Sequence, residues 1–120
     1  MKRAVWEQAR KHRHPRILIE DKGSGTQLIQ ELKREGLLYI RPYLPPTNTD
    51  KIVRLFAQSH HFESGKVLLP SGAAWLNEYT RELTSFPGSK HDDQVDSTTQ
   101  ALHYMSTNNN LEIWARLAEL

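Results

Sequence analysis

Acidic side chains gather at two places in this sequence, and carboxylates in such groups can bind metal ions. Glu20 closes a short apolar run, while Asp92, Asp93 and Asp96, here called the acidic cluster, fall where a helix is expected to begin. Neighbouring carboxylates repel one another unless a cation, a helix N-terminus or water offsets their charge. As hard oxygen ligands they favour Mg²⁺ or Mn²⁺, and two such ions about 4 Å apart can activate water and stabilise the leaving oxygen in phosphodiester cleavage.

A plainer interpretation of the same residues also stands. Aspartate is common at the start of a helix, so Asp92 and Asp93 can act as helix caps alone, and Glu20 can be an ordinary carboxylate at the edge of a sheet. The two interpretations differ in geometry. Because ligands collect at the carboxyl ends of the strands in open α/β sheets, the metal hypothesis predicts that Glu20 and the acidic cluster converge.

Alternating helix and strand patterns in the first part of the chain must position Glu20. Residues 2–11 predict a short helix, and the apolar run at 16–20 predicts a buried strand. A second helix is expected over 26–35 and a second strand over 37–43. Strand, helix and strand in succession form a βαβ unit with parallel strands and a right-handed crossover, so the sequence predicts the α/β class.

Helical patterns dominate the second part, which must position the acidic cluster. Helices are predicted over 50–59, 73–84 and 92–105, where apolar residues recur at helical spacing. A tight hairpin is expected over 62–70, around a Ser-Gly pair. A short terminal helix is expected over 111–120.

Length and composition limit the class of protein. With 120 residues the chain can form one compact domain, which we expect over 1–107, followed by a helical tail at 108–120. The absence of cysteine excludes disulfides, thiolate zinc sites and cysteine nucleophiles. No apolar run approaches the roughly 20 residues that span a bilayer, so we expect a soluble, intracellular protein. The net charge of +2 is too small to identify a nucleic-acid binder.

Histidines offer a weaker signal for a metal site. His12, His14, His60 and His61 occur in pairs but lack a compact zinc-binding spacing, so we expect them at the surface. His91 is the exception to watch, because it lies beside the acidic cluster.

Phosphate contacts are open at three places. The basic stretch at 10–14 can cap a helix or touch phosphate, and the turn at 23–25 can cradle a phosphate or simply satisfy turn geometry. Lys51 and Arg54 lie three apart on one face of a predicted helix, where they can grip a DNA backbone or remain solvated.

Five segments of the sequence, taken in order, match the motifs of a known family. They are 17–25 (ILIEDKGSG), 50–54 (DKIVR), 62–70 (FESGKVLLP), 86–87 (FP) and 91–96 (HDDQVD). From about residue 15 to residue 105 the chain resembles the nuclease domain of bacteriophage terminase large subunits. The resemblance implies a ribonuclease H-like fold lacking its first strands, with a short mixed or parallel sheet flanked by helices.

The resemblance also implies an activity and a set of site residues. Members of this family are metal-dependent endonucleases that cut concatemeric viral DNA during genome packaging. Glu20 matches the second catalytic acid of the family, and the acidic cluster matches the third acidic motif. Asp93 and Asp96 are the preferred catalytic ligands because they lie three apart on one helical face. Glu20 and the whole acidic cluster (Asp92, Asp93, Asp96) are thus the expected ligands of Mg²⁺ or Mn²⁺, with two ions in the complete site.

The sequence departs from the family pattern at one place. The first catalytic aspartate of the family lies on its first strand, and no Asp precedes Asp21 here. We therefore expect the first three strands to be missing and the chain to be incomplete or inactive alone. The alternative is a non-catalytic DNA-binding or packaging-assembly module that retains the fold.

The resemblance implies partners and a cellular setting as well. The expected partners are double-stranded DNA, an upstream terminase fragment carrying the ATPase motor and the first strands, the portal and the small terminase subunit. The expected setting is the cytoplasm of a bacterial host, with a phage or prophage origin and no membrane association.

Overall fold

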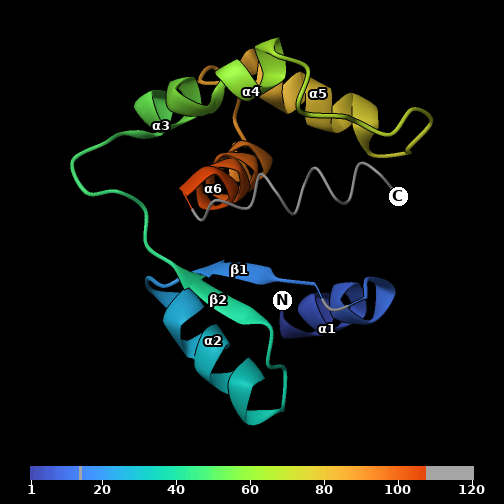
Figure 1. Cartoon of the computed structure of the whole chain (residues 1–120), viewed down its shortest axis with the longest axis vertical. Coiled ribbons are helices and arrows are strands. Elements are labelled where there is room, and N and C mark those ends of the chain that lie inside the picture. The colour runs from blue at the N-terminus through green and yellow to red at the C-terminus, as the bar shows by residue number, and fades with distance from the viewer. Residues whose placement is uncertain (14, 108–120) are drawn as a thin grey trace. The chain divides into compact units, whose positions relative to one another are not determined.

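A computed structural model describes residues 1–13 and 15–107 of the chain. Its contacts divide the chain into two compact units, Met1–Pro46 and the part from Thr47 onward (Figure 1). The single domain expected over 1–107 stays a prediction, and the helix expected over 111–120 lies outside the described residues. No helix in the described ranges is long and apolar enough to cross a membrane.

The first unit is a strand, a helix and a strand, preceded by another helix. Its elements are α1 (Lys2–Lys11), β1 (Ile17–Glu20), α2 (Ser24–Arg34) and β2 (Ile40–Tyr43). β1 and β2 pair in parallel, with Ile17 opposite Ile40 and Glu20 opposite Tyr43. Figure 1 shows α2 lying along this pair. Parallel strands joined by a helix confirm the α/β class predicted from the sequence.

A small apolar core holds the first unit together. Leu32 is fully buried on α2, together with Ile29 on the same helix and Ile40 on β2. Val5 and Trp6 of α1 pack against these side chains. Full burial of one large aliphatic side chain contributes about 1.5–3 kcal/mol. The stability of this unit therefore depends on a few aliphatic residues.

β2 begins later than predicted because a helix cap uses the chain before it. Gly36 adopts a left-handed conformation (φ 95°) after α2. The N–H of Gly36 donates to the carbonyl of Lys33 (3.1 Å) and that of Leu37 donates to the carbonyl of Leu32 (3.0 Å). These are the paired hydrogen bonds of a Schellman motif. Leu37 thus completes the end of α2 and packs into the core, and strand pairing starts only at Ile40.

The second unit is helical in the residues that the structure describes. Its elements are α3 (Lys51–Gln58), α4 (His60–Glu63), α5 (Leu76–Ser85) and α6 (Asp93–Thr107). α3 and α5 both pack against α6, where Val95 and Thr99 are buried. Figure 1 shows α3, α4 and α5 arranged over α6. The three longer helices confirm those predicted from the sequence, although α5 begins only at Leu76.

The hairpin predicted over 62–70 is wrong. Gly65 has a left-handed conformation (φ 75°) and ends α4. The N–H of Gly65 donates to the carbonyl of Phe62 (3.1 Å), and that of Lys66 donates to the carbonyl of His61 (3.0 Å), which is again a Schellman motif. The Ser-Gly pair therefore terminates a helix instead of turning a hairpin. Within the described ranges, β1 and β2 are the strands that pair.

Candidate active site

α6 begins inside the acidic cluster. Asp92 immediately precedes the helix, Asp93 is its first residue, and the N–H of Asp96 donates to the carbonyl of Asp92 (3.0 Å). Carboxylates in the first turn of a helix are stabilised by the partial positive charge of its exposed N–H groups. The start of α6 therefore offsets part of the repulsion within the acidic cluster.

A lysine from another helix pairs with the acidic cluster. The Nζ of Lys51 lies 2.9 Å from Oδ2 of Asp92 and 2.9 Å from Oδ2 of Asp96. Lys51 is the first residue of α3, and Asp50 caps this helix by accepting a hydrogen bond from the N–H of Val53 (2.9 Å). Because α3 packs against α6, one ammonium group meets two carboxylates.

The electrostatics of this contact favour the charged form of the lysine. The hydrogen bonds that Lys51 donates to Asp96 and Asp92 raise its pKa above the ordinary 10.5, and burial opposes them. The side chains of Lys51, Asp92 and Asp96 are 45%, 34% and 29% exposed, so solvent screens the two ion pairs. Lys51 is therefore protonated at neutral pH and offsets one of two neighbouring negative charges.

The contacts single out two members of the acidic cluster. Asp92 and Asp96 share Lys51, whereas Asp93 is exposed. Residues four apart lie on the same face of a helix, which explains why Asp92 and Asp96 meet one cation. The preference for Asp93 and Asp96 as catalytic ligands is untested, and the converging pair in this structure is Asp92 with Asp96.

Glu82 is a residue of this site that the sequence did not reveal. Its Oε2 accepts a hydrogen bond from the N–H of Val95 (2.9 Å), and its Oε1 accepts a long one from Nε2 of Gln94 (3.5 Å). A carboxylate of α5 thus satisfies an N–H group at the start of α6, next to the acidic cluster. No local sequence motif predicts this cap, because the capping residue belongs to a different helix.

Glu20 ends β1 at the carboxyl end of the parallel pair. The N–H of Asp21 donates to the carbonyl of Tyr43 (2.8 Å), which fixes the chain just beyond the strand. Gly25, the second residue of α2, is required because a Cβ there would overlap the carbonyl oxygen of Glu20. Gly23 has a positive φ of 59°. Turn geometry and close backbone approach thus account for both glycines.

The predicted convergence of Glu20 with the acidic cluster stays a prediction. Glu20 belongs to the first unit and the acidic cluster to the second. Among the residues that the structure describes, no three His, Asp or Glu side chains are grouped so that they could hold a metal ion. The structure brings two acidic side chains, Asp92 and Asp96, to the ammonium of Lys51.

His61 departs from the surface position expected for the histidines. It is only 8% exposed, its ring lies 3.9 Å from that of His60, and its Nε2 has no hydrogen-bond partner in the described part of the chain. Burial, followed by the charges of His60 and Lys66, lowers the pKa of His61 below its ordinary 6.5. The short helix α4 thus places His61 in a packed environment as a neutral ring. His91 is exposed.

Positive charge is concentrated in the first unit. Residues 1–46 contain ten Lys or Arg and five Asp or Glu, whereas residues 47–120 contain six and nine. Arg10, Lys11 and Arg13 are exposed at and beyond the end of α1. Exposed basic side chains in such a group suit contacts with a phosphate backbone.

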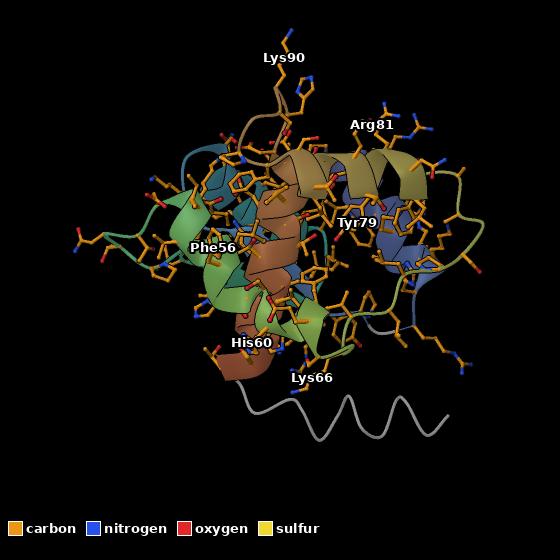
Figure 2. The ribbon with its side chains drawn as sticks, turned by 90° about the horizontal axis from the view of Figure 1, so that it is seen from above. Phe56, His60, Lys66, Tyr79, Arg81 and Lys90 are labelled. Atoms are coloured by element: carbon orange, nitrogen blue, oxygen red, sulfur yellow. The ribbon has the colours of Figure 1, made fainter. Side chains whose placement is uncertain are left out.

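The two basic residues predicted to grip DNA differ in their surroundings. Lys51 is paired with the acidic cluster, and Arg54 is partly buried on the same helix. Their contact with DNA stays a prediction. Figure 2 shows Lys90, in the loop before α6, and Arg81, on α5, extending away from the helices.

The comparison with protein families gives an independent result. A family model described as the terminase RNaseH-like domain matches residues 1–105 of the chain. No curated protein and no solved structure matches the chain significantly. The family match covers both the strand that ends at Glu20 and the helix that starts with the acidic cluster. The chain therefore belongs to the terminase RNaseH-like domain family.

Proposed function

We propose that this chain is part of the nuclease domain of a bacteriophage DNA-packaging terminase, whose reaction is the metal-dependent hydrolysis of DNA phosphodiesters. The observation that carries the proposal is that Asp92 and Asp96 converge on the ammonium of Lys51, which lies 2.9 Å from each carboxylate. The chain that carries them belongs to the terminase RNaseH-like family. Two carboxylates that meet one positive charge have the chemistry of a cation site.

The donor set fits a hard divalent cation. Mg²⁺ is usually held by one or two carboxylates, several waters and substrate phosphate oxygens. Asp92 and Asp96 supply two carboxylates, and the ammonium of Lys51 marks the point on which they converge. Asp93 and Glu20 are the further ligands proposed for a second ion. Bound Mg²⁺ or Mn²⁺ would supply water activation and neutralise charge on the scissile phosphate.

The protein itself contributes orientation. Glu82 holds the start of α6 through the N–H of Val95, and Tyr79 on α5 and Thr98 on α6 share a hydrogen bond of 2.6 Å. These two contacts join α5 to α6, one in the first turn of α6 and one in the next turn. They hold the backbone that carries Asp92 and Asp96, and phosphodiester hydrolysis depends on such positioning.

DNA contact is proposed for the first unit as well as for Lys51 and Arg54. The excess of basic residues in 1–46 suits the phosphate backbone of double-stranded DNA. By family membership, an upstream terminase segment with an ATPase motor, the portal and the small terminase subunit are the proposed protein partners. The proposed setting is a bacterial host cell.

We expect the 120-residue chain to cut DNA weakly without a partner. No Asp before Asp21 can match the first catalytic aspartate of the family, whereas two-metal hydrolysis needs several carboxylates in one place. An aspartate from an upstream terminase segment is the proposed missing ligand.

The experiment is Mn²⁺-dependent cleavage of plasmid DNA by the chain, alone and with the upstream segment added covalently or in trans. Cleavage should appear or rise strongly with that segment. It should fall at least about 100-fold in Glu20→Gln and in Asp96→Asn, because loss of a ligand should cost at least as much as the roughly 10–100-fold that loss of a residue supporting a ligand costs. Glu63→Gln, which changes an exposed carboxylate at the last residue of α4, should retain full activity. Absence of metal-dependent cleavage in the completed protein would reject the proposal.

A second candidate is a non-catalytic DNA-binding or packaging-assembly module. The pairing of Lys51 with the acidic cluster favours it, because ion pairs that join α3 to α6 have a structural role of their own. Such a module would bind DNA equally well with Mn²⁺ and with EDTA, and the completed protein would not cut.

A further inference from the structure

We propose that Lys51 is a tethered counterion of the acidic cluster, occupying the place that a divalent cation takes and leaving Asp92 and Asp96 when that cation enters. This inference rests on the proposed function, because it assumes that these two carboxylates bind metal. It adds a regulatory contact: the cation site is closed by a residue of the same chain.

The position of Lys51 on its own helix supports this assignment. Lys51 is the first residue of α3, and a cation at the N-terminus of a helix is disfavoured by the partial positive charge there. The local helix therefore does not stabilise the ammonium at this position. Its contacts with Asp92 and Asp96, both at 2.9 Å, stabilise it instead.

The charge balance explains why a divalent cation would displace the ammonium of Lys51 from Asp92 and Asp96. One ammonium leaves a net charge of minus one on the pair of carboxylates, whereas a divalent cation neutralises both. Oδ2 of Asp92 and Oδ2 of Asp96 accept hydrogen bonds from the same Nζ, so the ammonium and a metal ion bound between those oxygens exclude each other. Metal binding must therefore break both contacts of Lys51.

The exchange is also physically accessible. The side chain of Lys51 is 45% exposed, and lysine carries its compact charge on a flexible four-carbon stem. Ion pairs at this degree of exposure are weak and screened by solvent. The ammonium can thus move into water without unfolding α3, which keeps its cap from Asp50.

The test is a Mn²⁺ titration of the full chain, followed by the electron paramagnetic resonance signal of free Mn²⁺. The variants are Lys51→Met, which removes the competing charge, and Lys51→Gln, a second uncharged replacement. Lys90→Met is the matched control, because Lys90 lies two residues before Asp92 and extends away from the helices in Figure 2. Far-UV circular dichroism verifies that each variant is folded.

Mn²⁺ affinity should rise roughly fivefold to tenfold in Lys51→Met and Lys51→Gln, since two exposed ion pairs no longer compete. Lys90→Met should change the affinity by less than about twofold. Adding Asp96→Asn to Lys51→Met should abolish the gain. Together these results would establish the exchange.

Two other outcomes are informative in different ways. Binding that depends on Asp96 but is unchanged or weaker in both folded Lys51 variants would overturn the counterion role and leave the proposed function standing. Absence of Mn²⁺ binding in the parent and in every variant would overturn both.

Discussion

Replacing Glu82 removes the contact that fixes the start of α6. In Glu82→Ala, the N–H of Val95 loses the acceptor it has at 2.9 Å, and Gln94 loses its weaker contact at 3.5 Å. An N–H group at a half-buried helix end then has no partner from the protein, and the first turn of α6 is free to fray. The acidic cluster lies in and next to that turn.

The cost follows from two effects. Loss of a side-chain cap at a helix N-terminus costs about 0.5–2 kcal/mol, and loss of a negative charge beside that terminus costs about 0.3–1 kcal/mol. We expect Glu82→Ala to lower the free energy of unfolding by about 1–2 kcal/mol. Glu82→Gln keeps an acceptor oxygen and loses only the charge, so it should cost about 0.5 kcal/mol.

The assay is urea unfolding followed by far-UV circular dichroism, together with the Mn²⁺ titration described above. Glu78→Ala is the control, because Glu78 is an exposed carboxylate one turn earlier on α5. Glu78→Ala should cost less than about 0.5 kcal/mol. Mn²⁺ affinity should fall in Glu82→Ala and hold in Glu78→Ala. Equal stability and equal Mn²⁺ affinity for Glu82→Ala and the parent would refute the assigned cap.

Three further predictions concern backbone approach, the core and pH. Gly25→Ala should destabilise the first unit by about 1–3 kcal/mol in urea unfolding, because its Cβ would overlap the carbonyl oxygen of Glu20, and Ser24→Ala should be nearly silent. Leu32→Ala should cost about 2–5 kcal/mol in the same measurement, since Leu32 is fully buried, and a smaller loss would contradict the core described for α2. The pKa of His61 is lowered from 6.5, so its contribution to stability is fully present above pH 6.5 and is lost as pH falls through the folded-state pKa. The urea midpoints at pH 7.5 and pH 5.5 should therefore differ more in the parent than in His61→Leu.

Local sequence patterns determined most of the secondary structure. The parallel β1 and β2 with α2 between them and the helix that begins at the acidic cluster follow from short-range signals. The hairpin failed because a Ser-Gly pair can turn a hairpin or end a helix. Local pattern does not distinguish the two, and in this chain the hydrogen bonds of Gly65 and Lys66 end α4.

The arrangement around the acidic cluster was decided by tertiary structure alone. Sequence spacing favoured Asp93 with Asp96, but the packing of α3 on α6 brings Lys51 between Asp92 and Asp96. Lys51 and Glu82 belong to other helices than the acidic cluster, so the periodicity of the sequence does not predict either contact. The type of each residue, and the face of a helix on which it lies, can be predicted from the local sequence. Which charges meet depends on how separate helices pack, and that depends on the apolar surfaces they bury together.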